Sequence, residues 1–368
     1  ALALESDVLL AGAPDGASGQ GATYLFVRNR GGPDAWGLTR VFTATAGQPG
    51  AAFGRALALD EQAVAVGAPL HDLATTDEGA LFLFSRTGQV WVEQTQLSVP
   101  GAVITGNNSM AMSGDLLAVG APDALVNGDQ IGAVHLFQRN LGGTDQWGLV
   151  KRITAESVPN RAVGDLFGTA VAFAGETLIV GAPGFIGDQG AVFLFDRDQG
   201  GPDNWGETTI DEWHLGDTAG DRYGQTLVAD ESWFLVGAPL RDSIDPDEGI
   251  LRLYARVPSE IDGWDHISNM SGTGAGAELG SFMASSGDIA AAAKGSGGVY
   301  VYVISESTYS IFHWHTVQPS SAGLGQALAL AGDVLFIYDA DTYYDQSPFQ
   351  IFYRDAGGPD SWGRVKAF

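Results

Sequence analysis

Residues 167–183 read FGTAVAFAGETLIVGAP, and this stretch decides the fold. A short apolar segment, a tight turn at Gly175-Glu176 and a second apolar segment predict a β-hairpin. The Gly-Ala-Pro triplet that closes the stretch returns at positions 12–14, 67–69, 120–122 and 237–239, each time directly after an apolar run. Self-similarity of this kind is typical of repeat architectures.

Each triplet is followed by a polar loop, a glycine and a further apolar run, such as Val192 to Phe195. Two more units lack the triplet but keep the paired runs, Ile289 to Ala293 with Val299 to Val303, and Val334 to Tyr338 with Gln350 to Tyr353. Tryptophans about 54 residues apart on average mark the same units. They are Trp36, Trp91, Trp147, Trp205, Trp264, Trp314 and Trp362.

A fourth apolar segment follows the tryptophan turn, as at Thr39 to Phe42, so each unit reads as a four-stranded antiparallel meander. Runs such as Leu116 to Val119 are apolar at consecutive positions, which predicts strands covered on both faces. We therefore predict an all-β protein, a single seven-bladed β-propeller over residues 1–368. The expected blades are approximately 1–46, 47–100, 101–157, 158–216, 217–271, 272–319 and 320–368.

The chain is strongly acidic, with 44 Asp and Glu against 18 Lys and Arg and a net charge of -26. Nucleic acid is excluded as a partner, because binding to phosphates depends on Lys and Arg. Direct membrane insertion is also excluded, since no apolar run approaches the roughly 18 residues that a membrane span needs. Cysteine is absent, so neither disulfides nor thiol chemistry can contribute.

The pairs Phe53-Gly54 with Gly67-Ala68-Pro69, and Phe167-Gly168 with Gly181-Ala182-Pro183, resemble the FG-GAP repeat of integrin α-subunits and of many bacterial surface proteins. The resemblance implies a seven-bladed propeller whose loops on one face meet ligands. Some integrin blades carry an Asp-rich calcium loop between the first two strands. Here that connection is a hairpin of two or three residues, too short to surround a cation, so we do not expect that calcium set.

Acidic loops between the second and third strands provide the candidate binding residues, because these loops share one face with the Phe-Gly loops. Aromatic and polar side chains there are typical of a ligand surface, although ordinary loop packing is the alternative. The predicted ligand contacts are His71, Asp72, Asp77, Asp129, Trp233, Tyr343, Tyr344 and Asp345. Calcium is the one cofactor considered, with Asp242, Asp245, Asp247 and Glu248 as its candidate ligands, against a solvated loop as the alternative.

The turn Gly-Gly-Pro-Asp-x-Trp-Gly occurs at 31–37, 200–206 and 357–363, and at 142–148 with Thr144 in place of Pro. We interpret it as a turn whose Trp covers the blade edge, and the alternative is a set of exposed tryptophans that stack on sugars. No motif of a nucleophilic, metal-dependent or phosphate-binding enzyme is present.

From the fold and the charge we expect a non-catalytic module, not an enzyme, that is extracellular or at the surface of a bacterial cell. It would bind a protein or glycan through the loops of one face, as a domain of a larger protein with neighbouring domains. One alternative is a structural propeller in a surface assembly or filament. Another is a glycan-active enzyme, because acidic residues of different blades can meet in space.

Overall fold

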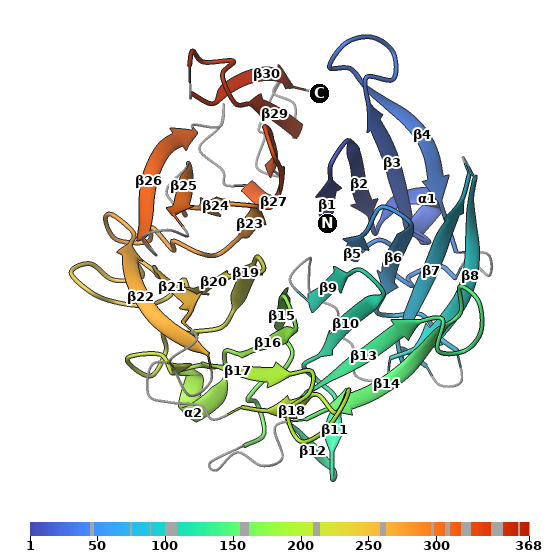
Figure 1. Cartoon of the computed structure of the whole chain (residues 1–368), viewed down its shortest axis with the longest axis horizontal. Helices are drawn as coiled ribbons and strands as arrows, with labels where there is room; N and C mark the ends of the chain where they lie inside the picture. The colour runs from blue at the N-terminus through green and yellow to red at the C-terminus, as the bar shows by residue number, and fades with distance from the viewer. Residues whose placement is uncertain are drawn as a thin grey trace. The chain divides into compact units, whose positions relative to one another are not determined.

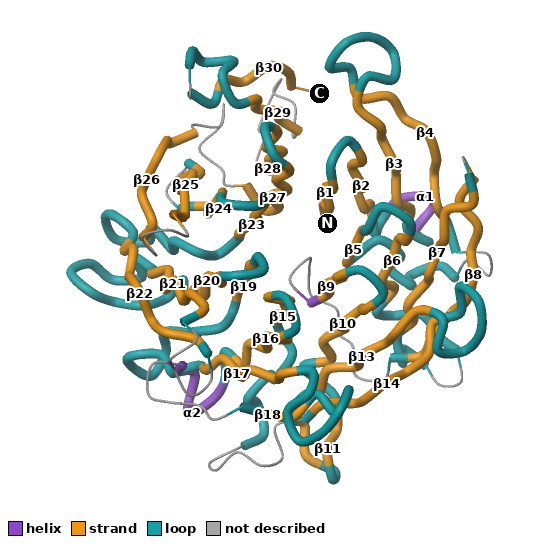
Figure 2. The backbone as a smooth tube through the Cα atoms, viewed as in Figure 1, coloured by secondary structure: helices purple, strands orange, loops and turns teal. Residues whose placement is uncertain are grey.

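The computed structural model describes the chain except residues 45–47, 74–75, 89, 100–108, 155–161, 209–213, 258–262, 296–297, 306–309, 318–324, 340–348, 360 and 368. Its described strands form seven four-stranded antiparallel sheets and one small hairpin (Figure 1). The two helices are single turns inside loops (Figure 2), and neither of them could cross a lipid bilayer. This confirms the predicted fold class, an all-β seven-bladed β-propeller.

By contacts the chain divides into two compact units, Ala1–Ala172 and Phe173–Phe368. The first unit holds three complete sheets. Blade 1 has β1 (Leu2–Glu5), β2 (Val8–Ala13), β3 (Ala22–Arg28) and β4 (Trp36–Phe42), with α1 (Gly16–Gly19) after β2. Blade 2 has β5 (Ala56–Leu59), β6 (Ala63–Ala68), β7 (Ala80–Thr87) and β8 (Val90–Ser98). Blade 3 has β9 (Met110–Ser113), β10 (Leu116–Ala121), β13 (Ala133–Arg139) and β14 (Trp147–Ile153), with the hairpin β11 (Leu125–Val126) and β12 (Asp129–Gln130).

Blade 4 begins at the boundary of the units with β15 (Ala170–Ala174) and continues with β16 (Thr177–Ala182), α2 (Phe185–Asp188), β17 (Ala191–Asp196) and β18 (Gly206–Glu207). Blade 5 has β19 (Thr226–Ala229), β20 (Trp233–Ala238), β21 (Ile250–Arg256) and β22 (Trp264–Ser271). Blade 6 has β23 (Met283–Ser286), β24 (Ile289–Ala293), β25 (Val299–Ser305) and β26 (Ser310–Val317). Blade 7 has β27 (Gly325–Ala331), β28 (Val334–Asp339), β29 (Phe349–Tyr353) and β30 (Gly363–Ala367).

The Phe-Gly and Gly-Ala-Pro motifs pack against each other across neighbouring blades. The Cα of Gly12 in blade 1 faces Gly54 in blade 2, and the Cα of Gly120 in blade 3 faces Gly168 at the start of blade 4. A Cβ at Gly120 would lie 1.8 Å from the carbonyl oxygen of Gly168, so no side chain fits there. The two glycines therefore allow adjacent blades to approach with backbone against backbone.

Most of the marker tryptophans are buried. Trp36 begins β4 and Trp147 begins β14, and both side chains are almost completely covered. Trp91, Trp205, Trp264 and Trp362 are buried as well. This confirms the structural interpretation of the tryptophan turn and shows that the alternative of exposed, sugar-stacking tryptophans is wrong.

The Asp of the tryptophan turn binds an arginine at the end of the third strand. Arg28 donates from Nε and Nη2 to Asp34 Oδ1, at 3.0 and 2.9 Å. In blade 3, Arg139 donates in the same way to Asp145 Oδ1, at 3.0 and 2.6 Å. The turn is thus held on its own strand by a charged hydrogen-bond pair. Blade 2 has no such turn, because only two residues separate β7 from β8.

Candidate functional site

A cavity of about 490 Å³ lies in the first unit, where blades 1 and 2 present their first hairpin turns. We call it the acidic pocket. The lining residues that matter for its chemistry are Glu5, Asp7, Asp60, Glu61, Arg86 and Trp91. Arg86, near the end of β7, and Gly88, in the short β7–β8 connection, also line it. The sequence departs from its own repeat at this place, since blade 2 lacks the tryptophan turn that binds the strand-end arginine in blade 1.

Tight hairpin turns bring the acids of the pocket together. The β1–β2 turn occupies Ser6 and Asp7, and the β5–β6 turn occupies residues 60–62. Asp60 donates its backbone N–H to Ala63 O at 3.0 Å, and its Oδ1 accepts the N–H of Gln62 at 3.1 Å. The bond from Gln62 holds the Asp60 carboxyl group on its own turn.

The charges of the pocket act most strongly on Glu5, at the end of β1. Partial burial and then the negative charges of Asp60 and Glu61 raise the pKa of Glu5 above its ordinary value. Removal of solvent and like charges both disfavour an ionised carboxyl. Glu5 therefore holds its proton to higher pH than an isolated glutamate does, and a carboxyl group of this kind can serve as a proton donor in acid–base catalysis.

Arg86 is the arginine among the lining residues of the pocket. Arg86 donates from Nε to Gly88 O at 3.0 Å, and its guanidinium lies 6.0 Å from the centre of the Trp91 ring. The pocket thus combines several carboxyl groups with a cation and an aromatic ring, in a volume suited to a small ligand.

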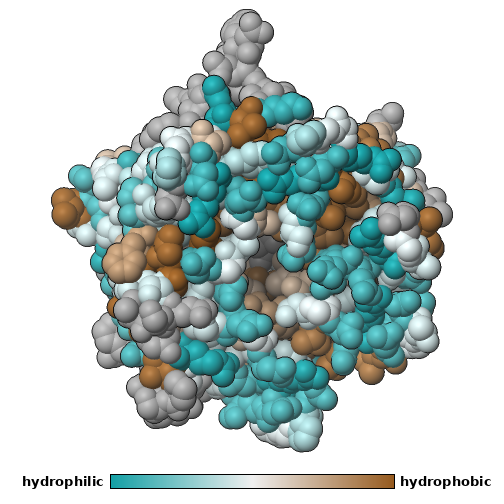
Figure 3. All heavy atoms as spheres, turned by 45° about the horizontal axis from the view of Figure 1, so that its top comes forward, coloured by the Kyte–Doolittle hydropathy of each residue, from teal (hydrophilic) through white to brown (hydrophobic). Residues whose placement is uncertain are grey.

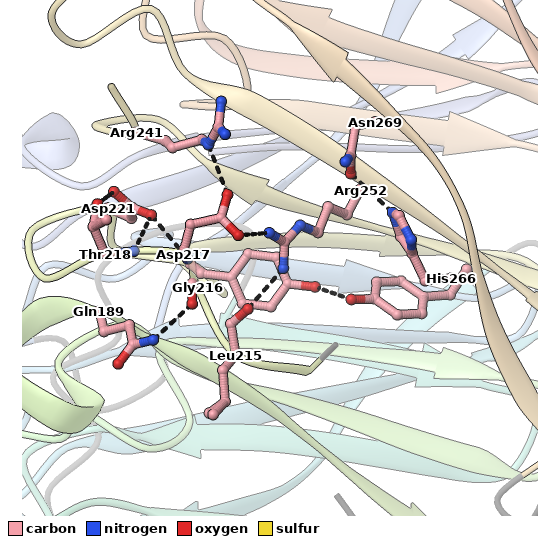
Figure 4. A network of polar contacts seen from close by, with 12 residues as sticks. Gln189, Leu215, Gly216, Asp217, Thr218, Asp221, Arg241, Arg252, His266 and Asn269 are labelled. Carbon is pink, nitrogen blue, oxygen red and sulfur yellow. Dashed lines mark hydrogen bonds and ion pairs between the residues drawn. The ribbon is translucent and has the colours of Figure 1, made fainter. Parts of the chain in front are cut away.

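A second polar cluster lies in blade 5, and Figure 4 shows it from close by. Asp217 is bound by Arg252 and, at 2.8 Å, by Arg241 Nε. Arg252 also donates to Leu215 O at 2.7 Å and stacks over the Tyr223 ring. The positions of β7 and β17 that correspond to Arg252 hold Phe82 and Phe193. Blade 5 therefore has a charged side chain where blades 2 and 4 have an apolar one.

The blade 5 cluster is too well covered to be a reaction site. Tyr223, Tyr254 and Arg252 are buried, and the hydroxyls of the two tyrosines bond each other at 2.6 Å. Burial raises the pKa of Tyr223, so its hydroxyl stays neutral. We therefore assign the cluster to the stability of blade 5.

Replacing Asp217 by alanine should lower the free energy of unfolding at pH 7 by about 2 kcal/mol. Breaking a fully buried ion pair costs roughly 3–5 kcal/mol, and the expected loss is smaller here because the Asp217 side chain is half exposed. Burial alone would raise the pKa of Asp217, but Arg252 and Arg241 lower it overall. The stabilisation is therefore present above the ordinary pKa of 3.8 and is lost as the pH falls through the lowered value. Urea unfolding of both proteins between pH 7 and pH 3 checks this. A loss that persists undiminished at pH 3 would contradict it.

The structure places the predicted ligand contacts in different settings. Asp72 and Asp77 are exposed in one loop, where Asp72 Oδ1 accepts the N–H of Asp77 at 2.6 Å and so stabilises the loop. Asp129 is exposed in β12. Tyr343, Tyr344 and Asp345 lie outside the described residues.

Two of the predicted contacts need correction, because they are buried. The His71 ring packs edge-on against Phe82 at 5.2 Å, and burial lowers the pKa of His71 despite the charge of Asp72. Trp233 begins β20 and lies in the core with Leu235 and Leu253. Neither side chain is offered to a ligand at the surface. Sequence pattern alone did not reveal the inward direction of these two side chains.

Two acidic side chains of the candidate calcium loop contact backbone N–H groups of the same loop. Asp242 Oδ1 accepts the N–H of Asp247 at 2.8 Å, and Glu248 is buried with Oε2 3.4 Å from the N of Asp245. In the part of the chain that the structure describes, no three His, Asp or Glu side chains are arranged to hold a metal ion. Calcium binding by this loop stays a prediction.

Hydrophilic residues predominate on the face shown in Figure 3, with apolar residues dispersed among them. The exposed large apolar side chains include Leu38, Val92, Leu125 and Ile244, which lie on different blades. Scattered apolar residues of this kind are normal on protein surfaces.

Comparison with known proteins supports the fold and changes the expected function. The model of the FG-GAP repeat matches residues 36–84 and 147–195. No curated protein matches the sequence. Among solved structures, a Bacteroides fragilis protein assigned as a 6-phosphogluconolactonase aligns over 98% of this chain and 93% of its own, with a TM-score of 0.63 and 14% identity. The periplasmic gluconolactonase of Pseudomonas aeruginosa aligns over 98% and 95%, with a TM-score of 0.59 and 11% identity.

At these identities the likeness establishes the shared fold, and the activities belong to those proteins. These two matched proteins are nevertheless described as sugar lactonases. This finding contradicts the prediction of a non-catalytic binding module and the prediction that the chain is not an enzyme. It favours the alternative of a glycan-active enzyme.

Proposed function

Since this chain is a seven-bladed propeller of FG-GAP repeats, we propose that it is a hydrolase of sugar derivatives whose reaction takes place in the acidic pocket, with neutral sugar lactones as its substrate class. The observation that carries this proposal is the meeting of Glu5, whose pKa is raised, with the carboxylates of Asp60 and Glu61 in one cavity. Titratable groups with perturbed pKa values cluster at functional sites. The likeness to sugar lactonases supports the choice of substrate.

The charge of the pocket favours a neutral substrate over a phosphorylated one. The acids that line the pocket, Glu5, Asp7, Asp60 and Glu61, outnumber its one lining cation, Arg86, although Arg28 Nη1 also lies 3.9 Å from Asp7 Oδ1. The whole chain carries a net charge of -26. A phosphate group would add about two negative charges to this field and be repelled. A neutral lactone enters without that cost.

In the proposed reaction, a carboxylate of Asp60 or Glu61 takes a proton from a water molecule, and the water oxygen forms a bond to the lactone carbonyl carbon. The ring carbon–oxygen bond then breaks, and Glu5 donates its proton to the departing ring oxygen. The product is an open aldonic acid, whose carboxyl group is ionised at neutral pH. Its new negative charge is repelled by the carboxylates of the pocket, and this repulsion assists release.

A direct test measures the hydrolysis of glucono-1,5-lactone by titration of the released acid, beside 6-phosphogluconolactone and neutral oligosaccharides assayed for reducing ends. We expect the purified chain to accelerate hydrolysis of the neutral lactone and to prefer it to the phosphorylated one. The double variant Asp60→Asn/Glu61→Gln should lose at least about 100-fold in rate. No acceleration over buffer with any of these substrates would refute the proposal.

The repeat itself offers the matched control. Asp230 and Glu231 occupy the same turn in blade 5, where Asp230 N donates to Trp233 O at 2.9 Å as Asp60 N does to Ala63 O. Asp230→Asn/Glu231→Gln removes the same charges from an equivalent turn and should keep the wild-type rate. Equal losses in the two double variants would point to net charge or folding and not to the pocket.

A further inference from the structure

The outer strand of blade 6, β26, differs from the outer strands of the other blades because it holds no Asp, Glu, Lys or Arg. Its sequence is SIFHWHTV. Each other outer strand carries at least one such residue, namely Arg40 in β4, Glu93 in β8, Lys151 and Arg152 in β14, Glu207 in β18, Asp265 in β22, and Arg364 and Lys366 in β30. Charged side chains on an edge strand hinder pairing with a further strand. β26 lacks this protection.

The backbone of β26 is open on one side. The sheet order places β26 at the outer edge of its blade (Figure 1). In the part of the chain that the structure describes, β26 pairs with β25 alone. Phe312 is 58% exposed on this strand, and His313 beside it is exposed as well. Trp314 instead packs against Trp362, with ring centres 6.2 Å apart, so the strand is fixed from inside while Phe312 faces solvent.

Charged residues are also sparse in the rest of blade 6. Residues 217–271 of blade 5 hold eleven acids and four arginines. Residues 272–319 hold four charged residues, Glu278, Asp288, Lys294 and Glu306. Aromatic residues are frequent there, and β25 and β26 supply Tyr300, Tyr302, Phe312 and Trp314. The cores of protein–protein interfaces are likewise poor in charged residues and rich in aromatic ones.

The charge of the chain indicates which partner fits this edge. A basic partner would be attracted to the acidic parts of the chain, such as blade 5. A second copy also carries a net charge of -26, so it can approach at the lowest cost where charges are fewest. An antiparallel pair of identical strands is two-fold symmetric, and the contacts that one copy makes are repeated by the other.

We propose that β26 is a dimerisation edge, at which β26 of a second copy of this chain adds in antiparallel orientation. Backbone hydrogen bonds between the two strands provide the pairing, as in other cases of strand addition at a sheet edge. The exposed Phe312 of each copy is then covered by the other copy. This inference is independent of the proposed reaction, because it involves no residue of the acidic pocket.

The test uses sedimentation velocity of the full chain over a range of protein concentrations. We expect a monomer–dimer equilibrium with a Kd below about 100 μM. Raising NaCl from about 0.05 M to about 0.5 M should lower this Kd at least about threefold, because salt screens the repulsion between two acidic copies. Phe312→Lys places a charge on the edge and should raise the Kd at least about tenfold.

The matched control is Val92→Lys in β8, which adds the same charge. Val92 is 44% exposed and pairs with the residue after Phe84, as Phe312 pairs with the residue after Tyr302. This variant should dimerise like the wild type. A dimer that forms equally well in a folded Phe312→Lys protein would overturn the proposal, and so would a wild type that stays monomeric at every protein and salt concentration.

Hydrogen exchange of the wild type gives a readout that does not depend on any variant. Backbone amides of residues 310–317 should exchange at least about tenfold more slowly in the dimer than at high dilution, because a second strand protects them. Amides of β30, the outer strand of blade 7, should exchange at the same rate in both samples. A dimer that leaves residues 310–317 unprotected would show that the copies meet at another surface and would also overturn the proposal.

Discussion

Alanine in place of Gly120 is expected to lower the free energy of unfolding by about 3 kcal/mol or more. The new Cβ would lie 1.8 Å from the carbonyl oxygen of Gly168 and 2.9 Å from its carbonyl carbon. Both obstructing atoms belong to backbone, so no side-chain rotation relieves the clash. Relief requires the start of blade 4 to move away from β10, which would also disturb the parallel bridge between Gly132 and Phe167. Urea unfolding followed by tryptophan fluorescence measures the effect.

The control for this substitution is Gly142→Ala, in the turn of the same blade. A Cβ there would meet only the Cβ of Gln146, at 3.3 Å. The free energy of unfolding should change by less than about 1 kcal/mol. If Gly120→Ala is as stable as Gly142→Ala, the backbone contact between the two motifs does not hold the blades together.

Sequence predicted the fold because the repeat is visible at two independent positions, the Gly-Ala-Pro triplet and the tryptophan. The run Leu116 to Val119 was predicted as a doubly covered strand, and β10 is buried along most of its length. What sequence did not show is the partner of each glycine. Gly12 meets Gly54 of the following blade and not its own motif, and a contact between residues of different blades leaves no local sequence pattern.

The acidic pocket was not predicted, although two signals of it are present in the sequence. The turn that holds Asp60 and Glu61 reads as a hairpin like the other first turns of the repeat, and the missing tryptophan turn of blade 2 does not by itself indicate a cavity. The acidic loops between second and third strands attracted the prediction instead, because they are longer and richer in Asp. In the structure their carboxylates, such as Asp72 and Asp242, bind backbone N–H groups of their own loops.

Substituting Glu5 by glutamine separates a catalytic from a structural role for the pocket. Glutamine keeps the shape of the side chain but cannot donate the proton, so lactone hydrolysis should fall by about 100-fold. In the wild type, the rate should fall as the pH rises through the raised pKa of Glu5, and this alkaline limb should vanish in Glu5→Gln. The control Glu231→Gln should keep both the rate and the limb.

The stability of Glu5→Gln should change in the opposite direction to its activity. Because folding raises the pKa of Glu5, the folded state binds the proton more tightly than the unfolded chain, and ionisation of Glu5 above its ordinary pKa weakens the fold. Removing that charge from beside Asp60 and Glu61 should therefore leave Tm at pH 7 unchanged or higher. A variant with a lower Tm and a lower rate would show that Glu5 supports the structure of the hairpin turns. A lower rate at an equal or higher Tm would show that Glu5 acts as a proton donor.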